Sequence, residues 1–312
     1  MVSWKDFEWF GHHKLLRIIR FKAKVINDEP LMIGAGRDAS IFEPAELVIV
    51  KMFDPKLNKY VPFIPGSSWK GVFRAHAVKI TRSQGLNTCE GIPNNTCLKG
   101  DEFSEFEERK LDTRAKIELI MQGEIGVSGC CLLCLSFGTP GILSHITFHD
   151  SLPLKEPKLG YRTMVAISRR TGASHPRALY SVEYIEPGSE FTFSIEAINL
   201  PNYAIGLLMI IVEHMNLGLV RVGGMKTRGF GRVHFENYEF ELYTLNKEYG
   251  IIDNKLKAID PIDSDITWGE KDAVKGDEAK RVMNEFIKAW NNALPILRKI
   301  SENRWRWSII GK

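Results

Sequence analysis

LGLVRVGGMKTRGFGRV, residues 217–233, places five glycines among the basic side chains of Arg221, Lys226, Arg228 and Arg232. Glycine adopts backbone conformations with positive φ and lets other groups approach the chain closely. Successive backbone N–H groups, together with guanidinium and ammonium groups, form a concave site for an anion. This stretch therefore predicts a loop that contacts a negatively charged partner.

The flanking segments predict a mixed architecture. NYAIGLLMIIVEHMN (202–216) predicts a buried helix, and GRVHFENYEFELYTL (231–245) alternates like a half-buried strand. LLRIIRFKAKVI (15–26) also ends in alternation. Further strand patterns occur at 145–152, 178–185 and 190–198. With a helix expected after Pro65-Gly66, the order strand, helix, strands, helix, strand predicts an α+β fold with a modified ferredoxin-like or RRM-like core.

A second unusual segment, FIPGSSWKGVFR (63–74), supplies the start of that helix. Ser67 can cap it, and Lys70 and Arg74 fall in its first two turns. A helix N-terminus presents unsatisfied N–H groups and a positive dipole to an anion, so a phosphate site is expected here. The alternative is a capped core helix whose basic residues are merely solvated.

The end of the chain has a different character. Residues 248–276 are charged and irregular, which predicts a linker or surface loop, and 278–300 predict an amphipathic helix kinked by Pro295. The predicted domains are therefore 1–247, with insertions at about 85–134 and 160–185, and a linker with a C-terminal helical extension at 248–312.

Composition, charge and motif endings exclude several classes of function. The 312 residues are 44% hydrophobic with a net charge of +4, so a nucleic-acid surface requires local clustering of charge. No secretory signal pattern is recognisable, and the apolar run at 204–212 is about half a membrane span. We therefore expect a cytoplasmic protein with no membrane partner. The glycine loop lacks the Gly-Lys-Ser/Thr ending of a nucleotide-hydrolysing loop, and GAGRDA (34–39) is not followed by the helix that a dinucleotide site requires.

Four of the five cysteines have the spacing of a metal site. Cys131 and Cys134 form a CxxC motif, and Cys89 and Cys97 form a looser pair upstream. Four thiolates leave no open coordination position, so they predict a structural Zn²⁺ that staples the insertion to the core. Cys130 is able to replace Cys131 as a ligand. Two disulfides, or plain buried thiols, are the alternatives.

Three blocks of the sequence resemble the RAMP superfamily of CRISPR-associated proteins. They are FIPGSSWKG, GGMKTRGFGRV and CLLCLSFGTPGILSHITFHD, and the likeness extends through 165–191 to cover about residues 15–245. The nearest likeness is to the cysteine-bearing branch of backbone subunits of type III effector complexes. The resemblance implies a subunit that packs in a row of copies or paralogous subunits along a crRNA, with a hairpin thumb between guide and target bases.

Many members of that family also cut target RNA with a loop aspartate and Mg²⁺ or Mn²⁺. The matching position here is Glu46 in PAELVIVK, and Asp38 is a second carboxylate in the same loop. The longer side chain of glutamate displaces the carboxylate by about 1 Å, which costs roughly 10²-fold where geometry is tight. The alternative is that Glu46 is a solvated residue of a non-cutting scaffold.

The resemblance and the charge pattern together give a set of residues expected to contact RNA. Arg169, Arg170 and Arg177 lie in the expected thumb. The full set of predicted contacts, Arg177 aside, is Arg37, Ser67, Ser68, Lys70, Arg74, Arg169, Arg170, Gly223, Gly224, Lys226, Arg228, Gly229 and Arg232. A glycine turn and a solvated basic hairpin are the competing interpretations.

Two other functions remain open at this stage. A stand-alone endoribonuclease that processes repeat RNA would need a catalytic histidine near the N-terminus, where His12 and His13 are the candidates. A non-catalytic architectural subunit would only organise partner proteins. His145 and His149 fit structural roles better than catalytic ones.

Overall fold

A computed structural model of the chain describes residues 2–35, 45–55, 58–92, 95–98, 104, 108–124 and 129–311, with only the backbone described at 174–178 and 311. The helices are η1 (Trp4–Phe10), α1 (Gly66–Ser83), α3 (Thr113–Gln122), α4 (Leu132–Phe137), α5 (Asn202–Asn216), η2 (Lys226–Arg228), η3 (Lys247–Tyr249), α6 (Gly276–Glu302) and η4 (Trp307–Gly311). The strands are β1 (Ile18–Asn27), β2 (Lys51–Asp54), β3 (Lys59–Pro62), β4 (Ile146–Phe148), β5 (Leu159–Ile167), β6 (Ser174–Ile185), β7 (Glu190–Ile198), β8 (Val233–Tyr243), β9 (Ile251–Ile252), β10 (Lys255–Leu256), β11 (Ile266–Thr267) and β12 (Ala273–Lys275).

The core is an antiparallel sheet with the strand order β12-β8-β1-β7-β4. Along the chain, α1 lies between β1 and β4, and α5 joins β7 to β8. Each of these β–α–β units therefore has its two strands separated by a strand of the other unit. The α+β class is confirmed, and α5 and β7 have the bounds that the hydrophobic periodicity predicted.

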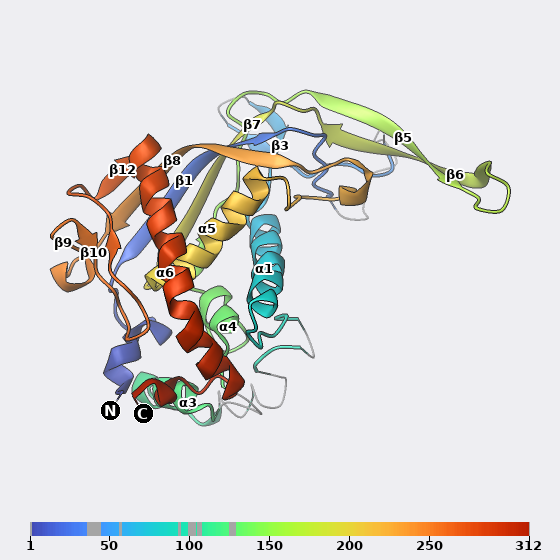
Figure 1. Cartoon of the computed structure of the whole chain (residues 1–312). Helices are drawn as coiled ribbons and strands as arrows, with labels where there is room; N and C mark the ends of the chain where they lie inside the picture. Colours follow the sequence, from blue (N-terminus) through green and yellow to red (C-terminus); the bar gives the residue numbers. More distant parts are fainter. Residues whose placement is uncertain are drawn as a thin grey trace.

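The two faces of the sheet have opposite character. The helices α1, α5 and α6 cover one face of the sheet (Figure 1). Phe21, Phe193 and Phe240 are buried on this face, where Phe193 contacts Trp69 of α1 and Phe240 contacts Phe286 of α6. On the other face Arg20 pairs with Glu196 at 2.8 Å and Lys24 pairs with Glu190 at 2.8 Å. Because these charges neutralise one another, the open sheet face does not form a basic surface.

The residues after β8 are part of the same packed body. The segment expected to be a linker or surface loop forms β9, β10 and β11, and β12 adds a fifth strand beside β8. Asp260 accepts hydrogen bonds from Trp9 Nε1 at 2.8 Å and from Tyr203 Oη at 2.9 Å. These bonds join the segment to η1 and α5. Charged composition was therefore a poor guide here, because the carboxylate of Asp260 is an acceptor for buried donors.

The terminal helix α6 packs along α5 and runs as one helix through Pro295 (Figure 1). Gly206 allows the close approach, since a Cβ at this position would lie 2.0 Å from the carbonyl oxygen of Phe286. Among the described residues, no helix combines the length and apolar content needed to cross a membrane.

We predict that Gly206→Ala lowers the free energy of unfolding by about 1–3 kcal/mol, because the added methyl group overpacks the α5–α6 contact. Gly71→Ala is the matched control: apart from the backbone of its own helix and its chain neighbours, no heavy atom lies within 4 Å of its Cβ position, and alanine favours the helix by about 0.5–1 kcal/mol. Urea unfolding of both variants measures the difference. Equal effects would contradict the tight packing of α6.

Candidate functional site

The glycine loop lies against the chain that follows β1. Gly223 has φ +80°, and a Cβ there would lie 2.3 Å from the carbonyl oxygen of Met32. Gly224 N donates to the same oxygen at 2.7 Å, and Gly231 N donates to Pro30 O at 2.9 Å. The loop therefore needs glycine both for its backbone conformation and for close approach.

Two of the four basic side chains of this loop are already neutralised. Arg221 forms a two-pronged ion pair with Glu29, and Arg232 lies 3.5 Å from Asp28. Opposite charge holds the pKa of Glu29 below its usual range, with the hydrogen bond from Arg221 as the largest cause. These pairs fasten the loop to the end of β1.

The other two basic side chains, Lys226 and Arg228, are exposed and pair with no carboxylate in the described part of the chain. Desolvation and the positive charge of Lys79 on α1 lower the pKa of Lys226. A nearby anion would relieve this repulsion. Arg228 Nη1 donates a hydrogen bond to Tyr180 Oη on β6, so the loop contacts the base of the β5–β6 hairpin.

This hairpin projects away from the helices and the main sheet (Figure 1). Arg169 and Arg170 are exposed at its turn. Exposed apolar side chains accompany them on the two strands: Val165, Ile167 and Leu179. The side chain of Arg177 lies outside the described part of the structure.

Aromatic side chains join the base of the hairpin to the glycine loop. The Arg162 guanidinium lies over the rings of Tyr184, at 5.4 Å, and Phe230, at 5.1 Å, and the two rings meet edge to face. Sequence reasoning missed this contact. The alternation of β6 places Tyr180, Val182 and Tyr184 on one side, but the partner at Phe230 is remote in sequence.

Glu46 lies beside the same part of β6. Its side chain is exposed, and its backbone N–H donates to Ser181 Oγ at 3.2 Å. The next residue, Leu47, forms a parallel bridge with Val182. Arg37 and Asp38 lie in residues 36–44, outside the described residues.

Glu183 on β6 holds the segment that follows Glu46 by hydrogen bonds. The sequence had not singled out this residue. It is fully buried, and accepts from Ile49 N at 3.1 Å and from Lys51 Nζ at 2.8 Å. The exposed Glu46 and the buried Glu183 therefore have different roles, one facing solvent and one holding strands together.

The start of α1 differs from the expectation. Its N-cap is Pro65, without a side-chain cap, so Ser67 lies in the first turn and does not cap the helix. Asp150 Oδ1 accepts from Gly66 N at 2.7 Å, which places a carboxylate at this helix N-terminus. Ser67 is exposed and Ser68 half-buried. The negative charge of Asp150 reduces the attraction of this end of α1 for a phosphate.

Arg74 also points away from the basic surface. Its Nη1 donates to Gly138 O at 2.7 Å, and its Nη2 approaches Cys134 Sγ at 3.5 Å. Burial and the positive charge of Arg74 lower the pKa of Lys70. The structure thus brings Arg228 next to the hairpin and Lys226 near Lys79 on α1, whereas Arg74 lies at the cysteines.

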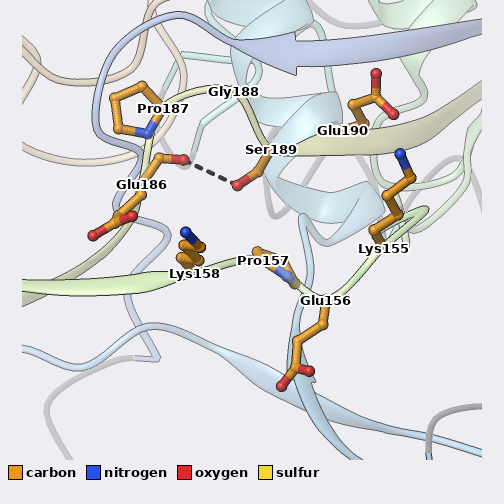
Figure 2. A pocket seen from close by; sticks show the side chains of 9 residues that line it. All are labelled: Lys155, Glu156, Pro157, Lys158, Glu186, Pro187, Gly188, Ser189 and Glu190. Atoms are coloured by element: carbon orange, nitrogen blue, oxygen red, sulfur yellow. Dashed lines mark hydrogen bonds between the residues drawn. The ribbon is translucent and has the colours of Figure 1, made fainter.

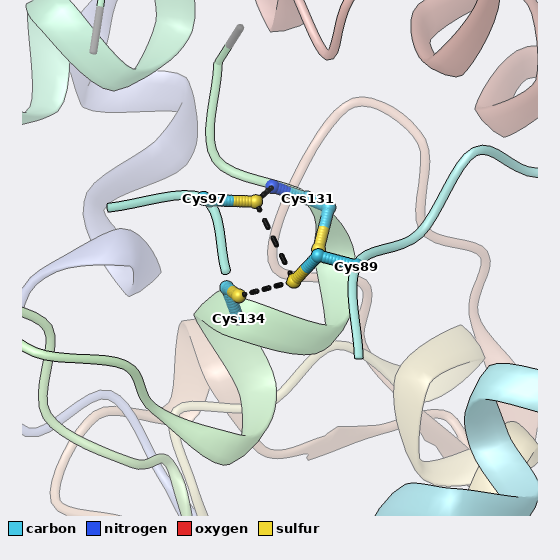
Figure 3. A group of neighbouring side chains, drawn as sticks. All are labelled: Cys89, Cys97, Cys131 and Cys134. Carbon is cyan, nitrogen blue, oxygen red and sulfur yellow. Dashed lines mark hydrogen bonds between the residues drawn. The ribbon is translucent and has the colours of Figure 1, made fainter. Parts of the chain in front are cut away.

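Cys89, Cys97, Cys131 and Cys134 come together as predicted (Figure 3). Their Sγ atoms all lie within 4.8 Å of one another, with 3.0 Å between Cys89 and Cys134 and 3.6 Å between Cys89 and Cys131. Tetrahedral zinc with Zn–S bonds of about 2.3 Å requires S···S separations of about 3.8 Å. The four side chains fit a metal ion after small adjustments.

Cys130 is not part of this cluster. It is fully buried, its carbonyl oxygen accepts from Trp307 Nε1 at 3.0 Å, and burial raises the pKa of its thiol. All five cysteines are free, so the structure does not contain the alternative disulfides. Among the described residues, the cysteine cluster is the one group of three or more His, Cys, Asp or Glu close enough to hold a metal ion, and Glu46 is outside it.

A shallow cavity of about 430 Å³ near the hairpin has a different lining (Figure 2). Its charged side chains are of both signs: Lys155, Glu156, Lys158, Glu186 and Glu190. Lys24 forms an ion pair with Glu190 at 2.8 Å. This balance of charge does not indicate a polyanion site.

His12 and His13, the histidines of the alternative enzyme model, are both exposed in the bend that follows η1. His12 stacks on His145 with 4.1 Å between ring centroids. His145 is buried and donates through Nδ1 to Ile198 O at 2.9 Å, and burial lowers its pKa to about 3. His145 is therefore a neutral structural residue. His149 is exposed after β4.

We predict that Gly223→Ala destabilises the protein by about 2–4 kcal/mol, because a strained φ adds to a clash with Met32 O. Gly229→Ala is the control, since its φ of +79° is similar but no heavy atom beyond its two chain neighbours lies within 4 Å of its Cβ position. It should lose about 1 kcal/mol. Urea unfolding compares them, and equal losses would mean that the close approach is not a constraint.

Comparisons with known proteins place the chain in a family. A comparison with curated proteins found no match. The model of the RAMP superfamily matches residues 28–234, about two thirds of the chain, and these residues contain the cysteine cluster, the hairpin and the glycine loop. Membership implies a CRISPR-associated, RNA-binding role. The chain therefore belongs to the RAMP superfamily.

Proposed function

We propose that this chain is a crRNA-binding backbone subunit of a type III CRISPR interference complex. In this role, copies of the chain or paralogous subunits line up along the crRNA and position complementary target RNA in the cytoplasm. The observation that carries the proposal is the free pair of cations, Lys226 and Arg228, on a glycine loop bonded to the projecting hairpin.

The core topology supports this proposal. The strand order β8-β1-β7-β4, with α1 and α5 as connections, supports the ferredoxin-like core that the sequence predicted. Because the open face of the sheet is covered by ion pairs, RNA is not expected to stack there. The glycine loop and the hairpin lie beyond the ion-paired strands and provide basic side chains together with exposed apolar ones.

The β5–β6 hairpin has the features expected of the thumb. Arg169 and Arg170 at its turn are available for phosphates, and Val165, Ile167 and Leu179 offer apolar surface to bases. Its strands contact the glycine loop at two places: Tyr180 accepts a hydrogen bond from Arg228, and Arg162 lies over Phe230.

The cysteine cluster takes structural zinc in this proposal. Cys89, Cys97, Cys131 and Cys134 supply four thiolates, and the bound ion joins residues 89–97 to the start of α4. The absence of an open coordination position limits zinc to holding the fold together.

Cleavage of target RNA is proposed for Glu46. Glu46 is exposed and its backbone lies beside β6, in the same region as the hairpin, and carboxylates hold Mg²⁺ or Mn²⁺ near phosphates. Any second ligand would come from the RNA, from Asp38 or from another subunit.

We predict that Lys226→Ala/Arg228→Ala weakens binding of single-stranded guide RNA by at least about 10-fold at moderate salt, because two phosphate contacts are lost. The slope of log K against log[salt] should fall by about 1.4, or roughly 0.7 per contact. Fluorescence anisotropy over a salt series measures both quantities.

The matched control is Lys247→Ala/Lys271→Ala. It removes the same charge from exposed positions just before β9 and just before β12, strands that lie across the molecule from the hairpin (Figure 1). The control should bind RNA like the unaltered protein. If RNA affinity fell equally in both double variants, binding would depend on net charge alone, and the proposed binding surface would be wrong.

Cleavage has its own test in the assembled complex with Mg²⁺. We predict that Glu46→Gln lowers target cleavage by about 10²-fold or more and leaves RNA affinity unchanged, whereas Glu46→Asp retains cleavage. Single-turnover cleavage of labelled target RNA measures the rates. An unchanged rate in Glu46→Gln would make this subunit a non-cutting scaffold.

A further inference from the structure

Arg74 is a charged side chain in an unusual position. It enters from α1, points between the turn at Gly138 and Cys134, and has no carboxylate partner within the described residues. Its Nε is buried without a hydrogen-bond partner in that part of the structure. The residue as a whole is half-buried, and withdrawing part of a cation from water without a counter-charge has a cost that an anion at this site would offset.

The surrounding backbone is shaped to hold this guanidinium. Gly91 has φ +71°, and a Cβ there would lie 1.9 Å from Arg74 Nη2. The turn that carries Gly91 connects Cys89 to Cys97, and Gly91 N donates to Asn95 O at 2.8 Å. The loop between two of the cysteines therefore packs directly on the guanidinium.

The charge of a loaded cluster supplies the missing anion. Four thiolates around one Zn²⁺ carry a net charge of −2. The guanidinium of Arg74 brings positive charge to the cluster, with Nη2 3.5 Å from Cys134 Sγ. Charge-assisted hydrogen bonds to a metal-bound thiolate lower its tendency to leave the metal.

We propose that Arg74 is the counter-charge of the four-cysteine cluster and retains its metal ion, an inference that rests on the zinc proposal above. Arg74 is a positioning residue in this role. It fixes Cys134 from one side and the loop of Cys89 and Cys97 from the other, and it links the metal to α1. This assignment replaces the RNA contact that the sequence predicted for Arg74.

Arginine is better suited to this site than lysine. Its planar fork reaches a carbonyl oxygen and a sulfur atom at once, as the contacts with Gly138 O and Cys134 Sγ show. The ammonium group of a lysine would keep the positive charge but would not make both of these contacts at once. A series of substitutions can therefore separate charge from geometry.

The test compares zinc retention by four proteins: the unaltered chain, Arg74→Met, Arg74→Lys and Lys79→Met. Lys79 is exposed on the same helix, so Lys79→Met makes the same loss of charge with the same new side chain. Elemental analysis gives zinc per chain, and a chromogenic chelator in excess gives the rate of zinc release.

We expect the unaltered protein and Lys79→Met to hold about one zinc ion and to release it slowly. Arg74→Met should release zinc about 10–100-fold faster, with Arg74→Lys in between. Gly91→Ala should also speed release, because it displaces the guanidinium without changing any charge.

Release from Arg74→Met at the rate of Lys79→Met would overturn the inference and leave the zinc proposal standing. A cluster that holds no zinc in the unaltered protein would defeat the zinc proposal, and the role of Arg74 with it. If Arg74→Met does not fold, Arg74→Lys decides: release no faster than from the unaltered protein overturns the inference.

Discussion

The contact between the glycine loop and the chain after β1 is the constraint on which the functional surface depends. Gly223 and Gly224 bring the loop to within hydrogen-bonding distance of Met32, some 190 residues earlier, and the ion pair of Arg221 with Glu29 holds it there. Because Arg221 and Arg232 are paired with carboxylates, Lys226 and Arg228 are the two basic side chains of the loop that remain exposed without such a partner among the described residues. Arg228 then reaches Tyr180, so one packed unit carries the loop and the hairpin.

The cysteine cluster likewise holds together segments that are remote in sequence, in this case beside α1. It joins two segments about 40 residues apart, and Arg74 connects it to the helix that starts at Gly66. In the proposed subunit, α1 is thereby held at two points, by Asp150 at its N-terminus and by the packing around Arg74 near its middle. A metal ion bound outside the proposed RNA-binding surface would in this way stabilise α1 and, through this helix, that surface.

The sequence predicted what depends on local periodicity and failed where remote groups decide. The bounds of α5 and β7 follow from hydrophobic spacing alone, and the cysteine set follows from its CxxC motif. Ser67 was a reasonable cap by residue type, but Asp150, more than 80 residues away, satisfies the helix start. Arg74 was predicted to contact RNA, and the sequence did not reveal its contact with Cys134, 60 residues away. Residues 248–275 looked irregular because β9 to β12 are only two or three residues long.

The central claim is that this chain coats a guide RNA, and the RNA that accompanies it tests this most directly. The protein would be purified from its native source at moderate salt, and the extracted RNA sized and sequenced. The account predicts discrete short RNAs that share a repeat-derived end. Protein that carries no nucleic acid and ignores added RNA at low salt would contradict it and favour a purely architectural subunit.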